Sequence, residues 1–144
     1  MKPLFDYEKL NVYQVCLSFN AWVGKLLREV NEKAALKDQL DRAATSIPLN
    51  IAEGNGKFSR KDRARYLDIA RGSALESASC LDVLVSRELA TEERIAAGKQ
   101  MLFETVNMLM GLLRRLGYEF ETGEWSARLR EDSPFEQEQE QDKE

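Results

Sequence analysis

The sequence predicts an all-α protein in which four antiparallel helices form an up-and-down bundle. Apolar residues recur three and four positions apart along four segments, which is the spacing of one face of an α-helix. No segment shows the alternation of a half-buried strand, and 8 Gly and 3 Pro in 144 residues are too few for a many-turned β sandwich. We expect one bundle over residues 1–118, followed by an acidic, mostly disordered C-terminal extension over residues 119–144.

The first predicted helix covers residues 8–32, with Asp6 as its N-cap. Its apolar stripe consists of Val12, Cys16, Phe19, Val23, Leu26 and Val30, and Tyr13, Val15, Trp22 and Leu27 widen it beyond one face. A helix that is apolar on more than one side is normally buried on more than one side. We therefore expect a homo-oligomer whose interface includes Tyr13, Trp22 and Leu26.

The second predicted helix covers residues 35–53 and contains Pro48. Proline inside a helix removes one hydrogen bond and costs about 3 kcal/mol. Because helical spacing continues on both sides of Pro48, we expect a kinked but continuous helix rather than two helices. Gly54, Asn55 and Gly56 tolerate a left-handed backbone and are expected to end it.

The third predicted helix follows the N-cap Ser59 and continues to about residue 87, with Asp62 completing a sequence that resembles a capping box. Its stripe is Leu67, Ala70, Ala74, Ala78, Leu81 and Leu84. The fourth helix starts at Thr91 and ends near Leu116, before Gly117. Its stripe is Ile95, Met101 or Leu102, Val106, Leu109, Leu112 or Leu113, and Leu116.

The charge is segregated along the chain. The net charge is −4, but residues 119–144 contain 10 acidic and 3 basic residues, so residues 1–118 carry a net positive charge. Residues 136–144 are Glu/Gln low-complexity sequence without an apolar residue, which predicts disorder. The tail is interpreted either as a solubiliser or as an internal polyanion that competes with phosphate for the positive body.

Several function classes are excluded by composition. The chain has no histidine, the usual general base and the commonest metal ligand, and no pair of carboxylates at a recognisable catalytic spacing. Cys16 and Cys80 are too few for a disulfide scaffold or a zinc site, and are expected to be buried, reduced thiols. We predict no enzyme activity, no catalytic residue, no metal and no cofactor. Without an apolar leader or an apolar stretch long enough to span a bilayer, the sequence indicates a cytoplasmic protein with no membrane partner.

The candidate nucleic-acid-binding residues form a basic cluster, Lys57, Arg60, Lys61, Arg63, Arg65 and Arg71. Only Asp62 and Asp68 oppose them, so the cluster could neutralise phosphates. Phe58 and Tyr66 lie close in sequence and could stack on unpaired bases. The alternative is a solvated helix face with local ion pairs such as Arg65–Asp68.

Three stretches resemble the four-helix bundle proteins encoded in bacterial 23S rRNA intervening sequences. Residues 42–54 match the R-A-A-x-S-I-P-x-N-I-A-E-G pattern of that family. Residues 5–14 resemble its F-x-x-L-x-V-Y/W-Q start, and residues 66–73 with Glu76 match its third-helix pattern. The resemblance implies a left-handed up-and-down bundle and, as in some relatives, a ring-shaped homopentamer. It extends distantly to the accessory proteins of diversity-generating retroelements, which are thought to bind nucleic acid and a reverse transcriptase.

The recognised motif has two interpretations. Arg42, Asn50 and Glu53 could form a functional surface. Alternatively, Arg42 and Glu53 pair with charges on neighbouring helices, while Ser46 and Asn50 satisfy backbone groups that Pro48 leaves without partners. Glu76, on the third predicted helix, is expected to be hydrogen-bonded structure. For the chain as a whole we expect a module that binds RNA or DNA; the alternative is a protein-interaction scaffold, such as an accessory subunit of a reverse transcriptase.

Overall fold

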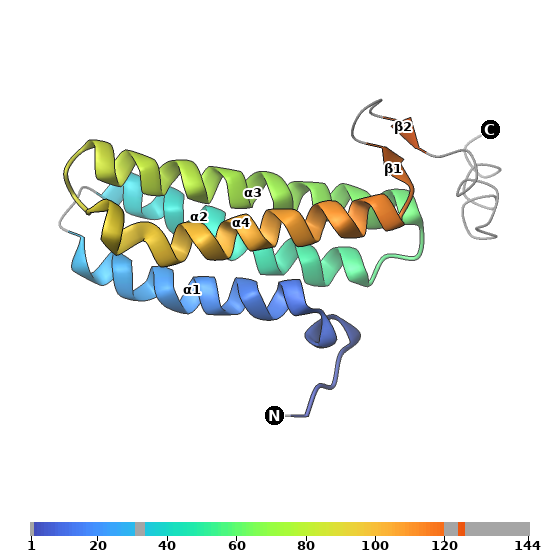
Figure 1. The fold of residues 1–144 in the computed structure, drawn as a ribbon. Coiled ribbons are helices and arrows are strands. Elements are labelled where there is room, and N and C mark those ends of the chain that lie inside the picture. Colours follow the sequence, from blue (N-terminus) through green and yellow to red (C-terminus); the bar gives the residue numbers. More distant parts are fainter. Residues whose placement is uncertain (1, 31–33, 120–123, 126–144) are drawn as a thin grey trace.

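A computed structural model describes residues 2–30, 34–119 and 124–125, and four long helices dominate it. The elements in chain order are η1 (Asp6–Lys9), α1 (Asn11–Glu29), α2 (Ala34–Asn55), α3 (Arg60–Ser86), α4 (Glu92–Arg115), β1 (Tyr118–Glu119) and β2 (Glu124–Trp125). The helices lie side by side with alternating direction, and each packs against two neighbours, so that α1 contacts α2 and α4 (Figure 1). The predicted four-helix bundle is confirmed. Of the extension predicted over residues 119–144, residues 120–123 and 126–144 lie outside the described residues.

The core is formed by the apolar stripes of all four long helices. Its largest fully buried side chains include Phe19, Leu26, Leu40, Ile47, Ile51, Leu81, Leu102 and Leu109. On α4 the structure selects Leu102 and Leu113, which are buried, over Met101 and Leu112, which are half-buried. Two buried hydroxyls donate to backbone carbonyls one turn earlier, Ser77 to Ser73 and Thr105 to Met101, each over 2.8 Å.

Two predicted helix starts are confirmed and one is wrong. The hydroxyls of Ser59 and Thr91 accept hydrogen bonds from the third backbone N–H that follows each of them. Asp6 does not cap α1, because Leu10 has an extended backbone (φ −74°, ψ 126°) and separates η1 from the helix that begins at Asn11. The Asp6 carboxylate instead accepts a hydrogen bond from the Asn55 side chain at 3.0 Å, which ties η1 to the end of α2.

Helix α2 runs without interruption through Pro48, as expected, but does not end in the way predicted. Within the described chain, positive φ angles occur only at Gly117 (100°), after α4, and at Glu88 (61°), after α3. Gly54 has a different role. A Cβ atom at Gly54 would lie 2.7 Å from the Cβ of Tyr66, so its missing side chain lets α2 and α3 approach closely.

A short antiparallel strand pair follows α4, which the sequence pattern did not predict. Tyr118 pairs with Trp125 and Glu119 with Glu124. Strands of two residues are too short to show an alternating pattern. The first residue of this pair, Tyr118, is half-buried and packs against the core, so the packing of the bundle extends past the end of α4.

Candidate nucleic-acid interface

One end of the bundle gathers basic residues from two distant parts of the chain. We call it the basic end and define it as Lys57, Arg60, Lys61, Arg63, Arg65, Arg114 and Arg115. It comprises the connection from α2 to α3, the first turns of α3 and the last turn of α4 (Figure 1). Arg63 and Arg115 line one surface hollow, and Lys61 and Arg65 line another with Tyr118.

The sequence reasoning missed Arg114 and Arg115. They lie about 50 residues from the α3 cluster in the sequence. They reach the same end of the bundle as that cluster only because α3 and α4 are antiparallel. The signal that could have found them is topological. In an up-and-down bundle the last turn of the fourth helix lies beside the first turn of the third.

Arg71 does not belong to the basic end. It lies further along α3, where its Nη2 and Nε atoms are 2.9 and 3.0 Å from Oδ1 of Asp68. The solvated-face interpretation paired Asp68 with Arg65. In the structure Asp68 pairs with Arg71 instead. The Arg71 charge is compensated locally, so we leave it out of the interface.

The α2–α3 connection holds its cations in fixed positions. Nε of Arg63 donates to the carbonyl of Lys57 over 2.6 Å. Nζ of Lys57 lies 4.9 Å from the ring centroid of Tyr66, and Cζ of Arg65 lies 5.3 Å from it. The half-buried Tyr66 ring thus positions two cations through cation–π contacts.

The cations of α3 oppose the dipole of their own helix. Arg60, Lys61 and Arg63 lie at its N-terminus, where each positive charge costs about 0.3–1 kcal/mol if exposed. Helix α4 has the favourable arrangement, with acidic residues in its first turn and Arg114 and Arg115 in its last turn. Interaction with the helix dipole therefore explains the basic residues in the last turn of α4 but not those at the start of α3. The N-terminus of a helix favours an anion.

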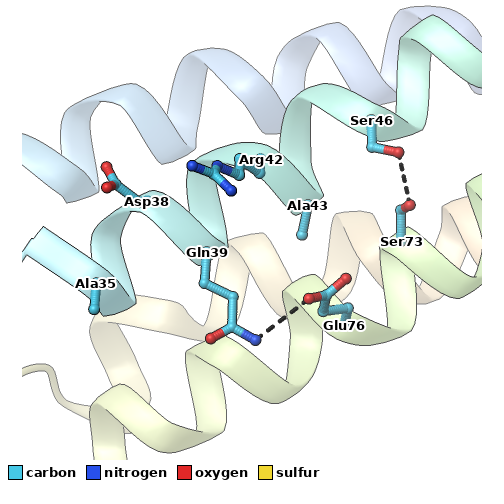
Figure 2. A pocket seen from close by; sticks show the side chains of 8 residues that line it. All are labelled: Ala35, Asp38, Gln39, Arg42, Ala43, Ser46, Ser73 and Glu76. Atoms are coloured by element: carbon cyan, nitrogen blue, oxygen red, sulfur yellow. Dashed lines mark hydrogen bonds between the residues drawn. The ribbon is translucent and has the colours of Figure 1, made fainter.

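A second feature is a polar groove of about 680 Å³ between α2 and α3. Gln39 reaches across it to Glu76, with 3.3 Å between Nε2 and Oε1, and the hydroxyls of Ser46 and Ser73 are 2.9 Å apart (Figure 2). Glu76 is thus hydrogen-bonded, as expected. Neither Arg42 nor Glu53 forms an ion pair with any residue the structure describes, so their predicted pairing with neighbouring helices is wrong; both are exposed.

Pro48 has no N–H, so the carbonyl of Ala44 lacks its helical donor. The expectation that Ser46 and Asn50 satisfy this carbonyl is wrong. The Asn50 amide bonds to the carbonyl and hydroxyl of Ser46 at 2.8 and 2.9 Å. The amide of Asn20, on α1, donates to the Ala44 carbonyl over 2.9 Å. Local spacing could not reveal Asn20, because the bond joins two helices.

The three predicted interface residues pack within a single chain. Leu26 is 1% exposed and belongs to the core, where no surface remains for a second copy. Trp22 is half-buried between Phe19, whose ring centroid is 5.8 Å away, and the guanidinium of Arg94. Tyr13 is half-buried and packs edge-on against Tyr7. Contacts with the rest of the chain therefore account for much of the wide stripe of α1, and the oligomer stays a prediction.

Among the residues that the structure describes, no cluster of three or more acidic or thiol side chains is arranged to hold a metal ion. None of the described helices combines the length and apolar character needed to cross a bilayer. Cys16 and Cys80 are buried thiols, as expected, and burial raises the pKa of both.

Comparison with known proteins agrees with the bundle. A sequence model described as 23S rRNA-intervening sequence protein matches residues 8–111. The crystal structure of a protein with unknown function from the S23 ribosomal protein family of Bacteroides thetaiotaomicron VPI-5482 is 28% identical in sequence, with a TM-score of 0.68. The match covers 72% of this chain and 98% of that one. No curated protein matches the chain.

Proposed function

The chain belongs to the family of 23S rRNA-intervening sequence proteins, and from that premise we propose that it is a cytoplasmic, homo-oligomeric module that binds RNA or DNA at its basic end. The proposal assigns it no reaction, since the sequence contains no histidine to act as a general base.

One observation carries the proposal. Cations from two segments about 50 residues apart gather at one end of the bundle, and those of α3 oppose the helix dipole there. Lysine and arginine that neutralise phosphates release condensed counterions, which is the main source of non-specific affinity for nucleic acid. In a homo-oligomer several copies of the basic end would add their potentials and attract a polyanion more strongly.

The experiment compares two triple variants that change the net charge equally. In the first, Arg60, Lys61 and Arg65 are replaced by Gln; Arg63 is retained because it fixes the Lys57 carbonyl. In the matched control, Lys25, Arg28 and Lys37 are replaced by Gln at the other end of the bundle. Binding of labelled RNA and DNA oligonucleotides is measured by fluorescence anisotropy over a range of salt concentrations.

The first variant should bind more weakly than wild type, with a slope of log affinity against log salt that is smaller by about two for single strands. The control should keep the wild-type slope. If wild type binds neither RNA nor DNA, or if both variants behave as wild type does, the proposal is wrong and the basic end is a solvated surface.

The homo-oligomer is tested separately by light scattering of the purified chain. We expect a mass well above the 16.5 kDa of a single chain, and a pentamer by the family resemblance. A monomer at micromolar concentration would contradict this part of the proposal.

A second candidate function is a protein-interaction scaffold, such as an accessory subunit of a reverse transcriptase. The observation that favours it is a set of exposed apolar side chains on α2 and α3, namely Leu49, Ile69 and Leu75, which are 66%, 45% and 50% exposed. Exposed apolar surface of this kind is typical of interaction sites when it is contiguous. Loss of partner binding on replacing Leu49 and Leu75 by Ser, with nucleic-acid binding unchanged, would favour the scaffold.

A further inference from the structure

Phe58 is the most exposed aromatic side chain among the large apolar residues of the described chain, with 80% of its surface open to solvent. It lies in the connection from α2 to α3, between Lys57 and the first residues of α3. Resting on the proposed function, we infer that Phe58 is a stacking platform for an unpaired base, and that the basic end takes single-stranded nucleic acid.

The backbone that carries Phe58 is held on both sides. Before it, the N–H of Lys57 donates to the Gly54 carbonyl over 3.1 Å, and the Lys57 carbonyl accepts from Arg63. After it, Ser59 is 3% exposed and its hydroxyl accepts from the Asp62 N–H at 3.1 Å. The ring is therefore presented by a preorganised connection, which reduces the entropy lost on binding.

The surroundings of Phe58 match what a single strand requires. Proteins that bind single strands combine a cationic surface, which follows the backbone, with aromatic rings on which bases stack. Lys57 precedes Phe58 and Arg60 and Lys61 follow it, so cations flank the ring along the chain. In a duplex the faces of the bases are covered by neighbouring base pairs, so no base face is exposed for this ring to stack on.

Tyr66 does not share this role. It is half-buried, and the cations of Lys57 and Arg65 lie over its ring. Of the two aromatic residues in the basic cluster, Tyr66 therefore positions cations, whereas Phe58 exposes most of its surface to solvent. This exposure assigns the stacking contact to Phe58.

The test uses labelled oligo-dT and oligo-U together with a duplex of equal length, and three variants of the full chain. Phe58→Ala removes the platform, and Phe58→Trp retains an aromatic face. Phe103→Ala is the matched control, because Phe103 is 63% exposed on α4 and is not part of the basic end. Circular dichroism checks that each variant is folded, as expected for exposed substitutions.

We expect Phe58→Ala to weaken binding of both single strands about tenfold. The salt slope should not change, since that slope counts phosphate contacts and not stacked bases. Phe58→Trp should bind as wild type or more tightly, with its indole fluorescence quenched by the strand, and Phe103→Ala should bind as wild type.

Two results would overturn the inference. In the first, Phe58→Ala binds single strands as tightly as wild type while the triple charge variant binds weakly; stacking then fails and the proposed function stands. In the second, wild type prefers the duplex and Phe58→Ala loses that preference, so that Phe58 acts as a wedge between base pairs. If the charge variant and Phe58→Ala are both neutral, the proposed function fails as well.

Discussion

The side-chain amide of Asn20 on α1 donates a hydrogen bond of 2.9 Å to the backbone carbonyl of Ala44 on α2. This carbonyl is the one whose helical donor is missing because residue 48 is proline. Ala44 is fully buried, so the carbonyl has no access to solvent. The cost of Pro48 is thus offset by a neighbouring helix, which explains how α2 remains continuous.

Replacing Asn20 by Ala should lower the free energy of unfolding by about 1–3 kcal/mol, because a buried carbonyl loses its donor. In a Pro48→Ala background the N–H of residue 48 can bond to the Ala44 carbonyl, so the same substitution should cost less. Urea denaturation of the four proteins gives the coupling, which we expect to be about 1 kcal/mol. Equal costs in the two backgrounds would mean that Asn20 stabilises the fold through its other bond, to the Cys16 carbonyl.

Two glycines should respond to alanine with opposite signs. Gly54→Ala places a Cβ atom 2.7 Å from the Cβ of Tyr66, close to the α3 backbone, and should destabilise the protein by about 1–3 kcal/mol. Gly72→Ala, in the interior of α3, meets no atom outside the backbone of its own helix within 4 Å and should stabilise by about 0.5–1 kcal/mol. Thermal unfolding of both variants checks the pair, and a stabilised Gly54→Ala would show that α2 and α3 can separate at little cost.

Glu88→Gly should stabilise the protein. Helix α3 ends with Glu88 at φ 61°, and the N–H groups of Glu88 and Leu89 bond to the carbonyls of Val85 and Leu84. This is the Schellman arrangement, in which glycine avoids the steric cost of the left-handed backbone. We expect a gain of about 1 kcal/mol by chemical denaturation. Glu88→Ala retains the Cβ atom and serves as the control, which should show no such gain.

Stability should fall at alkaline pH because of Cys16. Burial raises the pKa of this thiol to about 12, against an opposing hydrogen bond with Thr105. In the unfolded chain the thiol ionises near its ordinary value of 9.0, so the unfolded state releases a proton that the folded state retains. The contribution is present below about pH 9 and is lost as the pH rises toward 12, by about 1.4 kcal/mol per pH unit.

The measurement is urea denaturation of wild type and Cys16→Ala from neutral pH to about pH 10. Cys16→Ala should be less stable at neutral pH but lose less stability as the pH rises. Parallel pH profiles for the two proteins would show that Cys16 ionises in the folded state.

Much of the fold could be predicted from local pattern. The period of the apolar residues identified four helices, and most of the residues that form the core lie at the predicted positions because burying one helical face requires that spacing. Ser59 was recognisable as an N-cap and Thr91 as a helix start, and the bond that each hydroxyl accepts spans only three residues. Asp6 shows the limit of the same reasoning, since the backbone of Leu10 moves the start of α1 to Asn11.

The candidate site could be predicted only in part. The basic cluster on α3 is contiguous in sequence, whereas Arg114 and Arg115 join it because α4 runs antiparallel to α3.

What the sequence by itself determined is the number, order and apolar face of the helices, because the apolar period that reveals them arises within one turn or two. The tertiary structure decided the rest. It buried Leu26 in the core and placed the amide of Asn20 within hydrogen-bond distance of the Ala44 carbonyl. It also left Phe58 exposed and placed the Lys57 cation over the Tyr66 ring. The physical reason is that such relationships depend on which helices are neighbours and how each is rotated about its axis, and helical periodicity contains neither.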